Sequence, residues 1–409
     1  MEIDPVDSNK ESLLENLCVF ARDQLYGNIL PFWCALAPDD RKGGFAGRIT
    51  GEGVVLQDAP RGIILNARLL WTFSAVYSFN GNPLYLALAR RAYDYMIAYF
   101  FDEIYGGCYW NLDSSGTPIE DKKQTYAQAF VIFAFSCYYK ASREPGALEK
   151  AFALFELIEE KCHDQESDGY FEAFTRDWGV IADNRLSGKD LNEKKSMNTH
   201  LHLLEAYSSL LRVCRRDRLE MKLRELIGIF TGRIIDPSTF HQRLFFDEKW
   251  QCKSDLISYG HDIETSWLLY EAAMVTGDRE IIRSAAGISA GMAEAAIEGI
   301  NELGGLVHER KSGTACSGET EWWAQAEAVT GFLHAWRLTA DMKFLLQARR
   351  VSDFITRYVA DPKGGEWFYR LDKNGRPLAG YDKAGFWKCP YHNVRMCLEI
   401  LKYHATSSC

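Results

Sequence analysis

The stretch Gly106-Gly107-Cys108-Tyr109-Trp110 places two glycines and a cysteine before two aromatic residues, and related stretches recur along the chain. The spacing between copies is roughly 60 residues, except for one interval of about twice that length. A fixed period of this kind predicts one supersecondary unit stacked on copies of itself. The other copies are Gly43-Gly44-Phe45, Asp168-Gly169-Tyr170-Phe171, Gly304-Gly305-Leu306 and Gly364-Gly365-Glu366-Trp367-Phe368.

The double interval contains Phe240-His241-Gln242-Arg243-Leu244-Phe245-Phe246, which stands where the missing copy belongs but lacks its glycines. Counting this segment gives six units. Between the copies, apolar residues recur at helical spacing, and short breaks such as Asn80-Gly81-Asn82-Pro83 join helices into antiparallel hairpins. We expect helices near 8–27, 60–80, 83–101, 123–141, 145–162, 196–214, 217–234, 260–276, 279–297, 320–339, 341–360 and 390–404.

The two helices of each hairpin differ in character. The segments 83–101 and 341–360 carry charges along an amphipathic pattern, which suits an outer ring that faces water. Segments such as 60–80 and 123–141 are apolar throughout, as buried inner helices are. We therefore predict an all-α fold, an (α/α)6 barrel of six helical hairpins with short strands or turns at one end. The period also predicts that residues 1–409 form a single (α/α)6-barrel domain.

Composition narrows the class of protein. The chain has 409 residues, of which 47% are hydrophobic, enough for a large core. The formal net charge is −9, and no basic stretch is interleaved with aromatic residues, so we expect no nucleic-acid partner. The chain has no apolar run of membrane-spanning length, and its start, Met1-Glu2-Ile3-Asp4, is acidic. We expect a cytoplasmic protein without a membrane partner, as a monomer or homodimer.

Polar residues cluster near the starts of the predicted inner helices. If all six inner helices point the same way, these residues meet in one pocket, where helix N-termini also favour bound oxyanions. In chain order they are Arg68, Tyr126, Asn198, His202, His261, Glu264, Trp323, Glu327, His392 and Asn393.

Two of the histidines have a sequence context that suits acid–base chemistry. His261 lies in Ser258-Tyr259-Gly260-His261-Asp262-Ile263-Glu264, where the carboxylate three positions on shares its helix face and can fix the tautomer of the imidazole. A helix cap with a satisfied histidine is the alternative. His392 follows Pro390 just inside another inner-helix start. His202 can face the same way as Asn198, whereas His200 faces elsewhere and is expected to be structural.

Other candidates keep two interpretations. Arg68 lies in the apolar stretch Leu65-Asn66-Ala67-Arg68-Leu69-Leu70-Trp71, so it is either paired in a buried ion pair or directed at a ligand. The pair Trp322-Trp323 and Glu327 can be core aromatics with an ion pair, or one tryptophan can be a platform for a sugar ring. The role of His308 stays open. No His-Glu-x-x-His spacing occurs, so we expect no metal.

Four motifs together resemble the cellobiose 2-epimerase branch of the N-acylglucosamine 2-epimerase superfamily. They are Met197-Asn198-Thr199-His200-Leu201-His202, Ser258-Tyr259-Gly260-His261-Asp262-Ile263-Glu264, Trp322-Trp323-Ala324-Gln325-Ala326-Glu327 and Trp387-Lys388-Cys389-Pro390-Tyr391-His392-Asn393. The resemblance covers essentially the whole chain, and it implies an (α/α)6 barrel that needs no cofactor. It also implies that His261 and His392 are the acid–base pair and that Glu264 orients His261. The residues implied to hold the sugar are Arg68, Tyr126, Asn198, His202, Trp323, Glu327 and Trp387.

The implied reaction inverts C2 of the reducing-end glucose of a β-1,4-linked disaccharide, through ring opening and an enediolate. Cellobiose would give glucosylmannose, and lactose would give epilactose. The segment 309–321 carries no motif of the family, so an epimerase or isomerase of free mannose and glucose is the first alternative. Two further alternatives are an (α/α)6 glycosidase, which would use Glu264 and Glu327 as its carboxylate pair, and a non-catalytic sugar-binding protein.

Overall fold

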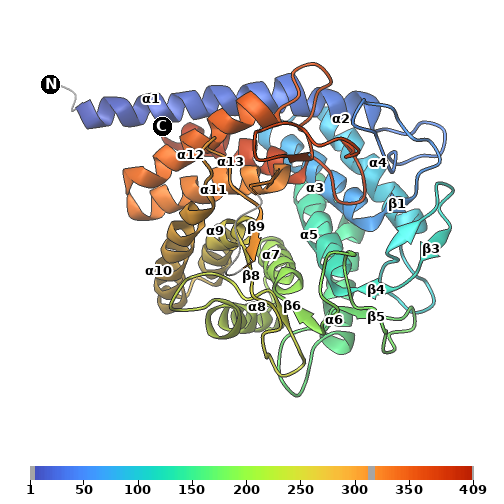
Figure 1. Ribbon diagram of the computed structural model, residues 1–409. Helices are drawn as coiled ribbons and strands as arrows, with labels where there is room; N and C mark the ends of the chain where they lie inside the picture. Colours follow the sequence, from blue (N-terminus) through green and yellow to red (C-terminus); the bar gives the residue numbers. More distant parts are fainter. Residues whose placement is uncertain (1–4, 312–317, 408–409) are drawn as a thin grey trace.

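The computed structural model describes residues 5–311 and 318–407, and it has the expected all-α (α/α)6 barrel fold (Figure 1). Six inner helices pack side by side in chain order, and the last contacts the first, which closes the ring. They are α3 (Ile63–Asn80), α5 (Thr125–Ser142), α7 (Met197–Val213), α9 (Tyr259–Thr276), α11 (Trp322–Thr339) and α13 (Tyr391–Ser407).

Six outer helices cover this ring, each packed against its inner partner. The first, α1 (Pro5–Arg22), packs on α13 and runs along one side of the barrel (Figure 1). It continues through the π-helical segment η1 (Asp23–Ile29) into α2 (Leu30–Leu36), well past the predicted end at residue 27. Pro31 of α2 has no backbone N–H, so the regular hydrogen-bond ladder cannot pass through it. The other outer helices are α4 (Pro83–Tyr99), α6 (Pro145–Lys161), α8 (Asp217–Ile229), α10 (Arg279–Ala296) and α12 (Met342–Phe354); η2 (Phe230–Ile234), η3 (Ile297–Gly299) and η4 (Ile355–Val359) extend the last three.

The breaks within hairpins have the predicted chemistry. Asn82 caps α4 by accepting a hydrogen bond from the backbone N–H of Leu84 at 3.0 Å, and Pro83 is the first helical residue. Asp278 caps α10 in the same way through the N–H of Glu280 at 2.9 Å. Such N-caps satisfy donors that the helix cannot satisfy itself. The structure therefore confirms that the Asn80–Pro83 break is a helix boundary.

The glycine-aromatic segments make the turns that lead from each outer helix to the next inner helix. Gln128, one turn into α5, clamps Cys108: its Oε1 accepts the N–H of Cys108 at 2.8 Å and its Nε2 donates to the carbonyl at 3.1 Å. Gly107, which precedes Cys108, has a positive φ of 72°, and a Cβ atom at this position would come within 2.8 Å of the Trp178 ring. Each turn also carries an isolated antiparallel bridge: Pro38 with Phe45, Phe101 with Cys108, His163 with Tyr170, Ile235 with Gln242, Ile300 with Leu306, and Ala360 with Trp367.

The fourth copy, which lacks glycines, has the same geometry. Phe240 takes a positive φ of 60° in place of glycine. The N–H of Gln242 donates to Asp262 of α9 at 2.9 Å, as the N–H of Cys108 does to Gln128 of α5. The sixfold repeat predicted from spacing is therefore present in the structure.

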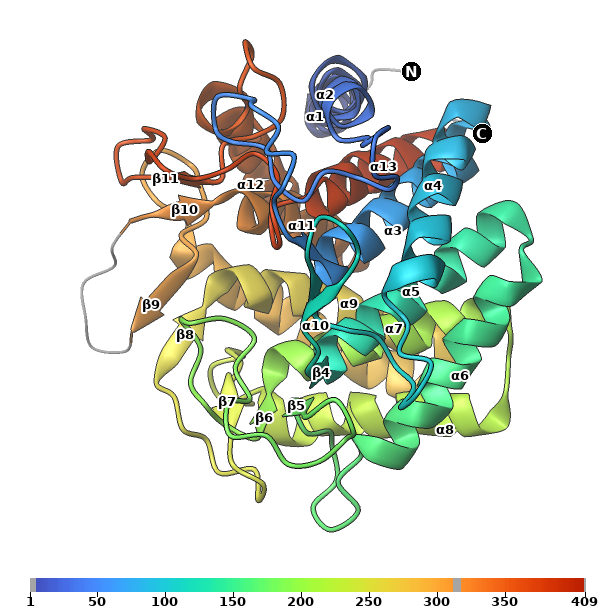
Figure 2. The same ribbon diagram turned by 90° about the vertical axis from the view of Figure 1, so that its right-hand side faces the viewer.

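Short antiparallel strands link neighbouring units on one side of the barrel (Figure 2). The strand before an inner helix pairs with a strand of the next unit, and the bridge between Ile49 and Ala384 joins the last unit to the first. The pairs are β1 (Arg61–Gly62) with β2 (Asn111–Leu112), β4 (Lys123–Gln124) with β5 (Ala173–Phe174), β6 (Lys195–Ser196) with β7 (Phe245–Phe246), β8 (Leu256–Ser258) with β9 (Glu309–Lys311), and β10 (Thr320–Glu321) with β11 (Arg370–Leu371); β3 (Pro118–Glu120) adds to β2.

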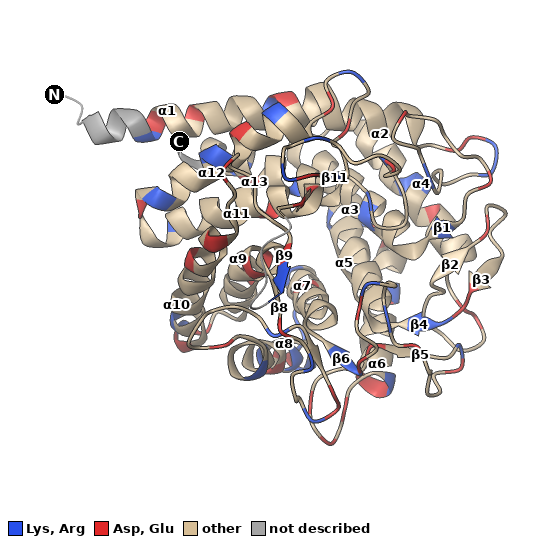
Figure 3. Cartoon of the chain, viewed as in Figure 1, with Lys and Arg blue, Asp and Glu red and all other residues tan. Residues whose placement is uncertain are grey.

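The inner helices are buried over most of their length, and charged residues are concentrated on the outer helices and loops (Figure 3). The few charged residues on the inner helices therefore need a specific reason to be there. None of the described helices combines the length and the apolar character needed to cross a bilayer.

Candidate active site

A cavity of about 390 Å³ opens where the inner helices begin. Side chains of all six inner helices line it, as the common orientation of these helices predicts. Of the predicted site residues, Arg68, Tyr126, Asn198, His202, His261, Glu264, Trp323, Trp387 and His392 line the cavity. Further lining comes from a loop over residues 184–191 and from His308, whose position the sequence left open.

His392 is held by a carboxylate. Its Nδ1 lies 2.7 Å from Oε1 of Glu327, which leaves Nε2 as the nitrogen available to the cavity. Burial lowers the pKa of His392 to about 3, although Glu327 opposes that shift. Glu327 itself is fully buried, and its Oε2 accepts the indole N–H of Trp267 at 3.0 Å. Glu327 is not among the residues that line the cavity, because it lies one turn deeper than Trp323 and behind His392, and its expected contact with the sugar stays a prediction.

His261 is held by a hydroxyl instead. Its Nδ1 lies 2.7 Å from Oγ of Ser258, the residue at the N-cap of α9, whose side chain makes no cap hydrogen bond to the backbone. Burial, followed by the proximity of His308, holds the pKa of His261 well below its ordinary value. The expected pairing with Glu264 is not found. Glu264 accepts a hydrogen bond from Arg395 Nη2 at 2.8 Å, because one further turn of α9 directs it toward the barrel axis rather than toward β8.

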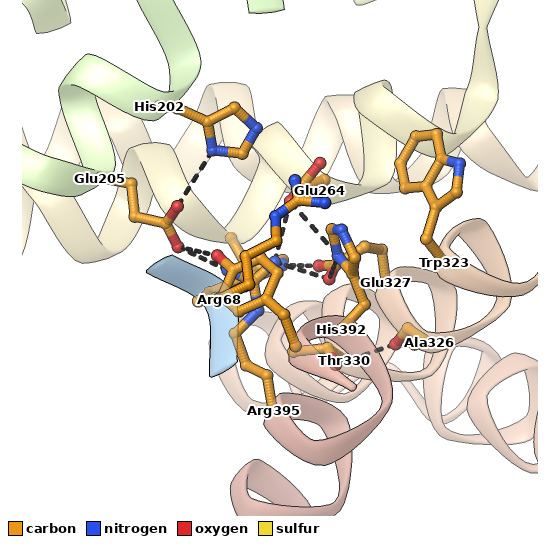
Figure 4. A network of polar contacts seen from close by, with 12 residues as sticks. Arg68, His202, Glu205, Glu264, Trp323, Ala326, Glu327, Thr330, His392 and Arg395 are labelled. Atoms are coloured by element: carbon orange, nitrogen blue, oxygen red, sulfur yellow. Dashed lines mark hydrogen bonds and ion pairs between the residues drawn. The ribbon is translucent and has the colours of Figure 1, made fainter. Parts of the chain in front are cut away.

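Arg395 is the centre of a buried network beneath the cavity (Figure 4). Its Nη1 donates to Glu205 at 2.5 Å, and its Nη2 donates to Glu264 at 2.8 Å and Glu327 at 2.6 Å. Burial and the neighbouring Glu327 raise the pKa of Glu264. Burial also acts on Glu327, but Arg395 and His392 outweigh it and lower the pKa of that carboxyl. The two carboxyls that share Nη2 of Arg395 therefore have pKa values shifted in opposite directions, that of Glu264 upward and that of Glu327 downward.

The same network reaches His202. Its Nδ1 lies 3.0 Å from Oε2 of Glu205 (Figure 4). Oε1 of Glu205 accepts a hydrogen bond from the hydroxyl of Tyr391 at 2.5 Å. Our sequence reasoning missed Glu205 and Arg395. Both stand three positions after a candidate histidine, His202 and His392, which is the spacing that drew attention to Glu264.

The contacts of Arg68 distinguish between the two interpretations of this residue, a buried ion pair or a contact with a ligand. Its guanidinium donates to the hydroxyl of Tyr126 at 3.0 Å and to the carbonyl of Trp387 at 3.3 Å, and it stacks 4.4 Å from the ring centre of Phe130. Among the described residues no carboxylate forms an ion pair with it. A buried cation on the cavity wall without a carboxylate partner suits a ligand that carries or develops negative charge.

Aromatic rings form the walls. The Trp323 ring lies 4.7 Å from His261 and 5.6 Å from His392, measured between ring centres, so it stands between the two histidines. Trp322 also lines the cavity and packs 4.5 Å from Tyr369. Both tryptophans therefore reach the cavity. Trp387, which also lines the cavity, packs 5.8 Å from Tyr126, measured between ring centres.

Hydrogen bonds also fix the side chains of His200 and Glu172. His200 accepts the N–H of Tyr170 at 3.0 Å and its Nδ1 faces the carbonyl of Ser196 at 2.6 Å, so it is structural as expected. Glu172, which the sequence did not single out, lines the cavity, and its carboxylate accepts Ser196 N–H and Thr199 Oγ1, each at 2.8 Å. Burial raises the pKa of Glu172 to about 7, against those two hydrogen bonds.

We expect the free energy of unfolding of the Glu172→Gln variant, relative to that of wild type, to increase as pH rises. A native pKa raised from 4.5 to about 7 means that the folded protein binds more protons than the unfolded chain between these values. Wild-type stability therefore falls as pH rises through this window, by up to about 3 kcal/mol at 1.36 kcal/mol per unit, and the glutamine variant lacks this loss. Urea unfolding of both proteins at pH 5 and pH 8 measures it. A difference that is the same at both pH values would contradict the assignment.

Glu264, Glu327 and His392 each place a possible metal-ligand atom within 4.8 Å of the others. The guanidinium of Arg395 already lies between the two carboxylates, within 2.8 Å of each. A metal ion would have to displace this cation. The cluster is therefore balanced by an arginine of the chain itself.

Comparison with known proteins identifies the class. The family model for N-acylglucosamine 2-epimerase matches residues 43–396. A cellobiose 2-epimerase of Bacteroides fragilis is 46% identical over 379 residues, which cover 92% of this chain and 97% of the relative. The structure of cellobiose 2-epimerase from Bacillus thermoamylovorans superposes with a TM-score of 0.90 at 37% identity, covering 95% of this chain and 100% of that one. A sugar epimerase from a ruminal bacterium gives 0.91 at 35% identity, covering 94% and 98%.

The protein is thus a carbohydrate epimerase, which is a kind of isomerase. Its fold is a closed (α/α)6 barrel, and histidines line the cavity where the inner helices begin. The chain belongs to the N-acylglucosamine 2-epimerase family. The family resemblance, the fold and the enzyme class expected from the sequence are confirmed.

Proposed function

We propose that this enzyme inverts C2 of the reducing-end glucose of a β-1,4-linked disaccharide, converting cellobiose to glucosylmannose and lactose to epilactose. The observation that carries the proposal is the pair His261 and His392, which enter one cavity from α9 and α13 on either side of α11. The relatives named above support the disaccharide as substrate. Free mannose or glucose is the alternative substrate.

The two histidines divide the proton transfers. His261 has only a hydroxyl on its Nδ1 and can serve as the base, whereas Glu327 beside Nδ1 of His392 counteracts burial and stabilises the imidazolium that forms before His392 delivers a proton. After the sugar ring opens, Nε2 of His261 takes the proton from C2, and the electron pair forms the C1–C2 double bond of an enediolate with its charge on O1. His392 then donates its proton to the other face of C2, and the C1 carbonyl reforms. The reverse reaction exchanges the roles.

The charge that develops on the enediolate needs a donor in place before the reaction. Arg68 meets this requirement, because it is a buried cation on the cavity wall. Oδ1 of Asn198 is a further candidate for a sugar hydroxyl, since it is buried and has no hydrogen-bond partner in the described part of the chain. Trp323 and Trp387 offer apolar faces for the sugar ring.

The glycosidase alternative fits the geometry less well. Its two catalytic carboxylates must flank the scissile bond across a gap. Glu264 and Glu327 instead share one nitrogen of Arg395, and Glu327 lies behind His392. A non-catalytic sugar-binding protein would have no use for His261 and His392 in this arrangement.

Incubation with cellobiose followed by separation of the products tests the proposal. We expect glucosylmannose. Free glucose would support the glycosidase, and unchanged cellobiose would support the binding protein. To distinguish the monosaccharide alternative, kcat/KM is compared for cellobiose, lactose, glucose and mannose. A value for mannose at least tenfold above that for cellobiose, about 1.4 kcal/mol in transition-state binding, would contradict the disaccharide assignment.

We expect epimerisation to persist after exhaustive treatment with a chelator. The chemistry proposed uses imidazoles and a guanidinium, and Arg395 already balances the carboxylates that could hold a metal. The initial rate with cellobiose is measured before and after dialysis against EDTA. A rate that vanishes and returns only with one specific metal would show that the site needs it.

We also propose that residues 1–409 act as one catalytic domain, in the cytoplasm, as a monomer or homodimer. A net charge of −9 supports the expectation that nucleic acid is not a partner.

A further inference from the structure

Glu321 lines the cavity, and in the described part of the chain one of its carboxylate oxygens accepts a hydrogen bond while the other has no hydrogen-bond partner. It lies on β10, opposite Arg370 of β11, and its side chain is 6% exposed. Oε2 accepts the indole N–H of Trp323 at 3.0 Å. Oε1 is buried and has no hydrogen-bond partner among residues 5–311 and 318–407. A buried acceptor without a partner is costly, so a ligand or water is expected to satisfy it.

The surroundings of Oε1 favour a polar, uncharged ligand. Arg370 Nε lies 3.6 Å away, and Lys189 Nζ and His308 Nδ1 each lie 3.7 Å away. All three distances exceed that of a hydrogen bond, so these groups surround the oxygen without occupying it. A sugar hydroxyl can donate to Oε1 and accept from one of these neighbours at the same time.

The position of Oε1 separates it from the reacting carbon. The Trp323 ring contacts His261 and His392, and its N–H edge is tied to Glu321. Lys189, whose Nζ lies 3.7 Å from Oε1, belongs to the loop that lines the cavity, and its side chain is 68% exposed. Oε1 therefore lies between the acid–base histidines and the mouth, where the second ring of a disaccharide would extend.

We propose that Glu321 is a specificity-determining residue for the disaccharide: its Oε1 accepts a hydrogen bond from a hydroxyl of the sugar ring attached to the reacting glucose. The inference rests on the proposed function. Glu321 acts on binding of the outer ring and leaves the proton transfers at C2 to the histidines. A free monosaccharide, which lacks this ring, gains nothing from Glu321.

Glu321→Gln tests the proposal with little change in shape. The amide oxygen can still hold the Trp323 indole, while an NH2 group replaces the idle acceptor. The matched control is Glu319→Gln. This change removes a carboxylate that lies 3.0 Å from Nε of the same Arg370, but Glu319, unlike Glu321, does not line the cavity. Kinetics with cellobiose are compared with deuterium uptake at C2 of free mannose in D2O, followed by NMR over long incubations.

We expect Glu321→Gln to lower kcat/KM for cellobiose by about 10- to 100-fold, mostly through KM. Exchange on mannose should stay within about twofold of wild type, and Glu319→Gln should change neither quantity by more than that. Equal losses on both sugars would show that Glu321 acts only by holding Trp323, and no loss on cellobiose would show that Oε1 is not used; either result overturns the inference. Wild-type enzyme that fails to epimerise cellobiose would instead refute the proposed function.

Discussion

Replacement of His261 or of His392 by alanine is expected to lower kcat for epimerisation by about 10²- to 10⁴-fold, the usual contribution of a general acid or base. Each variant removes one of the two imidazoles that exchange protons with C2. The loss should appear in kcat, because the interaction is made in the transition state. The rate of glucosylmannose formation from cellobiose measures it.

The control is His163→Gln, since His163 does not line the cavity and its Nδ1 contacts Gln165. This variant should keep wild-type activity. Circular dichroism and thermal unfolding of all three variants show whether the barrel is intact. Turnover near the wild-type rate in either alanine variant would refute the role of that histidine.

Arg395→Met is expected to be the most destabilising single change in the site. It removes the cation that compensates Glu205, Glu264 and Glu327, all of which are buried. Breaking a buried charge network by deleting one partner costs about 3–5 kcal/mol, because the remaining charges are left unpaired. Urea unfolding measures the loss, and epimerase activity should fall with it because His202 and His392 lose the fixed positions of their carboxylates.

Arg212→Met provides the comparison, because Arg212 pairs with Glu271 at the surface and its side chain is half exposed. Its loss should cost no more than about 1 kcal/mol. If both variants unfolded at the same urea concentration, the network around Arg395 would not contribute as described.

Most of the fold could be predicted from the sequence. Spacing of the glycine-aromatic segments predicts six units even where Phe240 replaces glycine, because the turn needs a positive φ that phenylalanine can adopt at a cost. The breaks at Pro83 and Pro145 locate hairpins because proline and its capping neighbours act locally. The extension of the first helix to Leu36 was missed, since a π-helical segment carries no simple apolar period.

The site was predictable in its members but less so in its contacts. Most cavity residues could be predicted from their position at the N-terminal ends of the inner helices, because helices that all point the same way bring these ends together. The partners of His261 and Glu264 were wrong, because residues three apart on a helix can diverge when one lies in the first turn and the other faces the barrel axis. Glu172 and Glu321 could not be found in this way, because pairings between strands of distant segments place Glu321 and the β5 strand that follows Glu172.

Epimerisation of cellobiose in D2O tests the central claim most directly, that two different imidazoles serve the two faces of C2. Because the proton that His392 delivers is not the one that His261 removes, the mannose unit of the product should carry deuterium at C2 from the first turnovers. The measurement is the NMR signal of C2–H in newly formed glucosylmannose. Full retention of the original hydrogen at C2 during inversion would contradict the account.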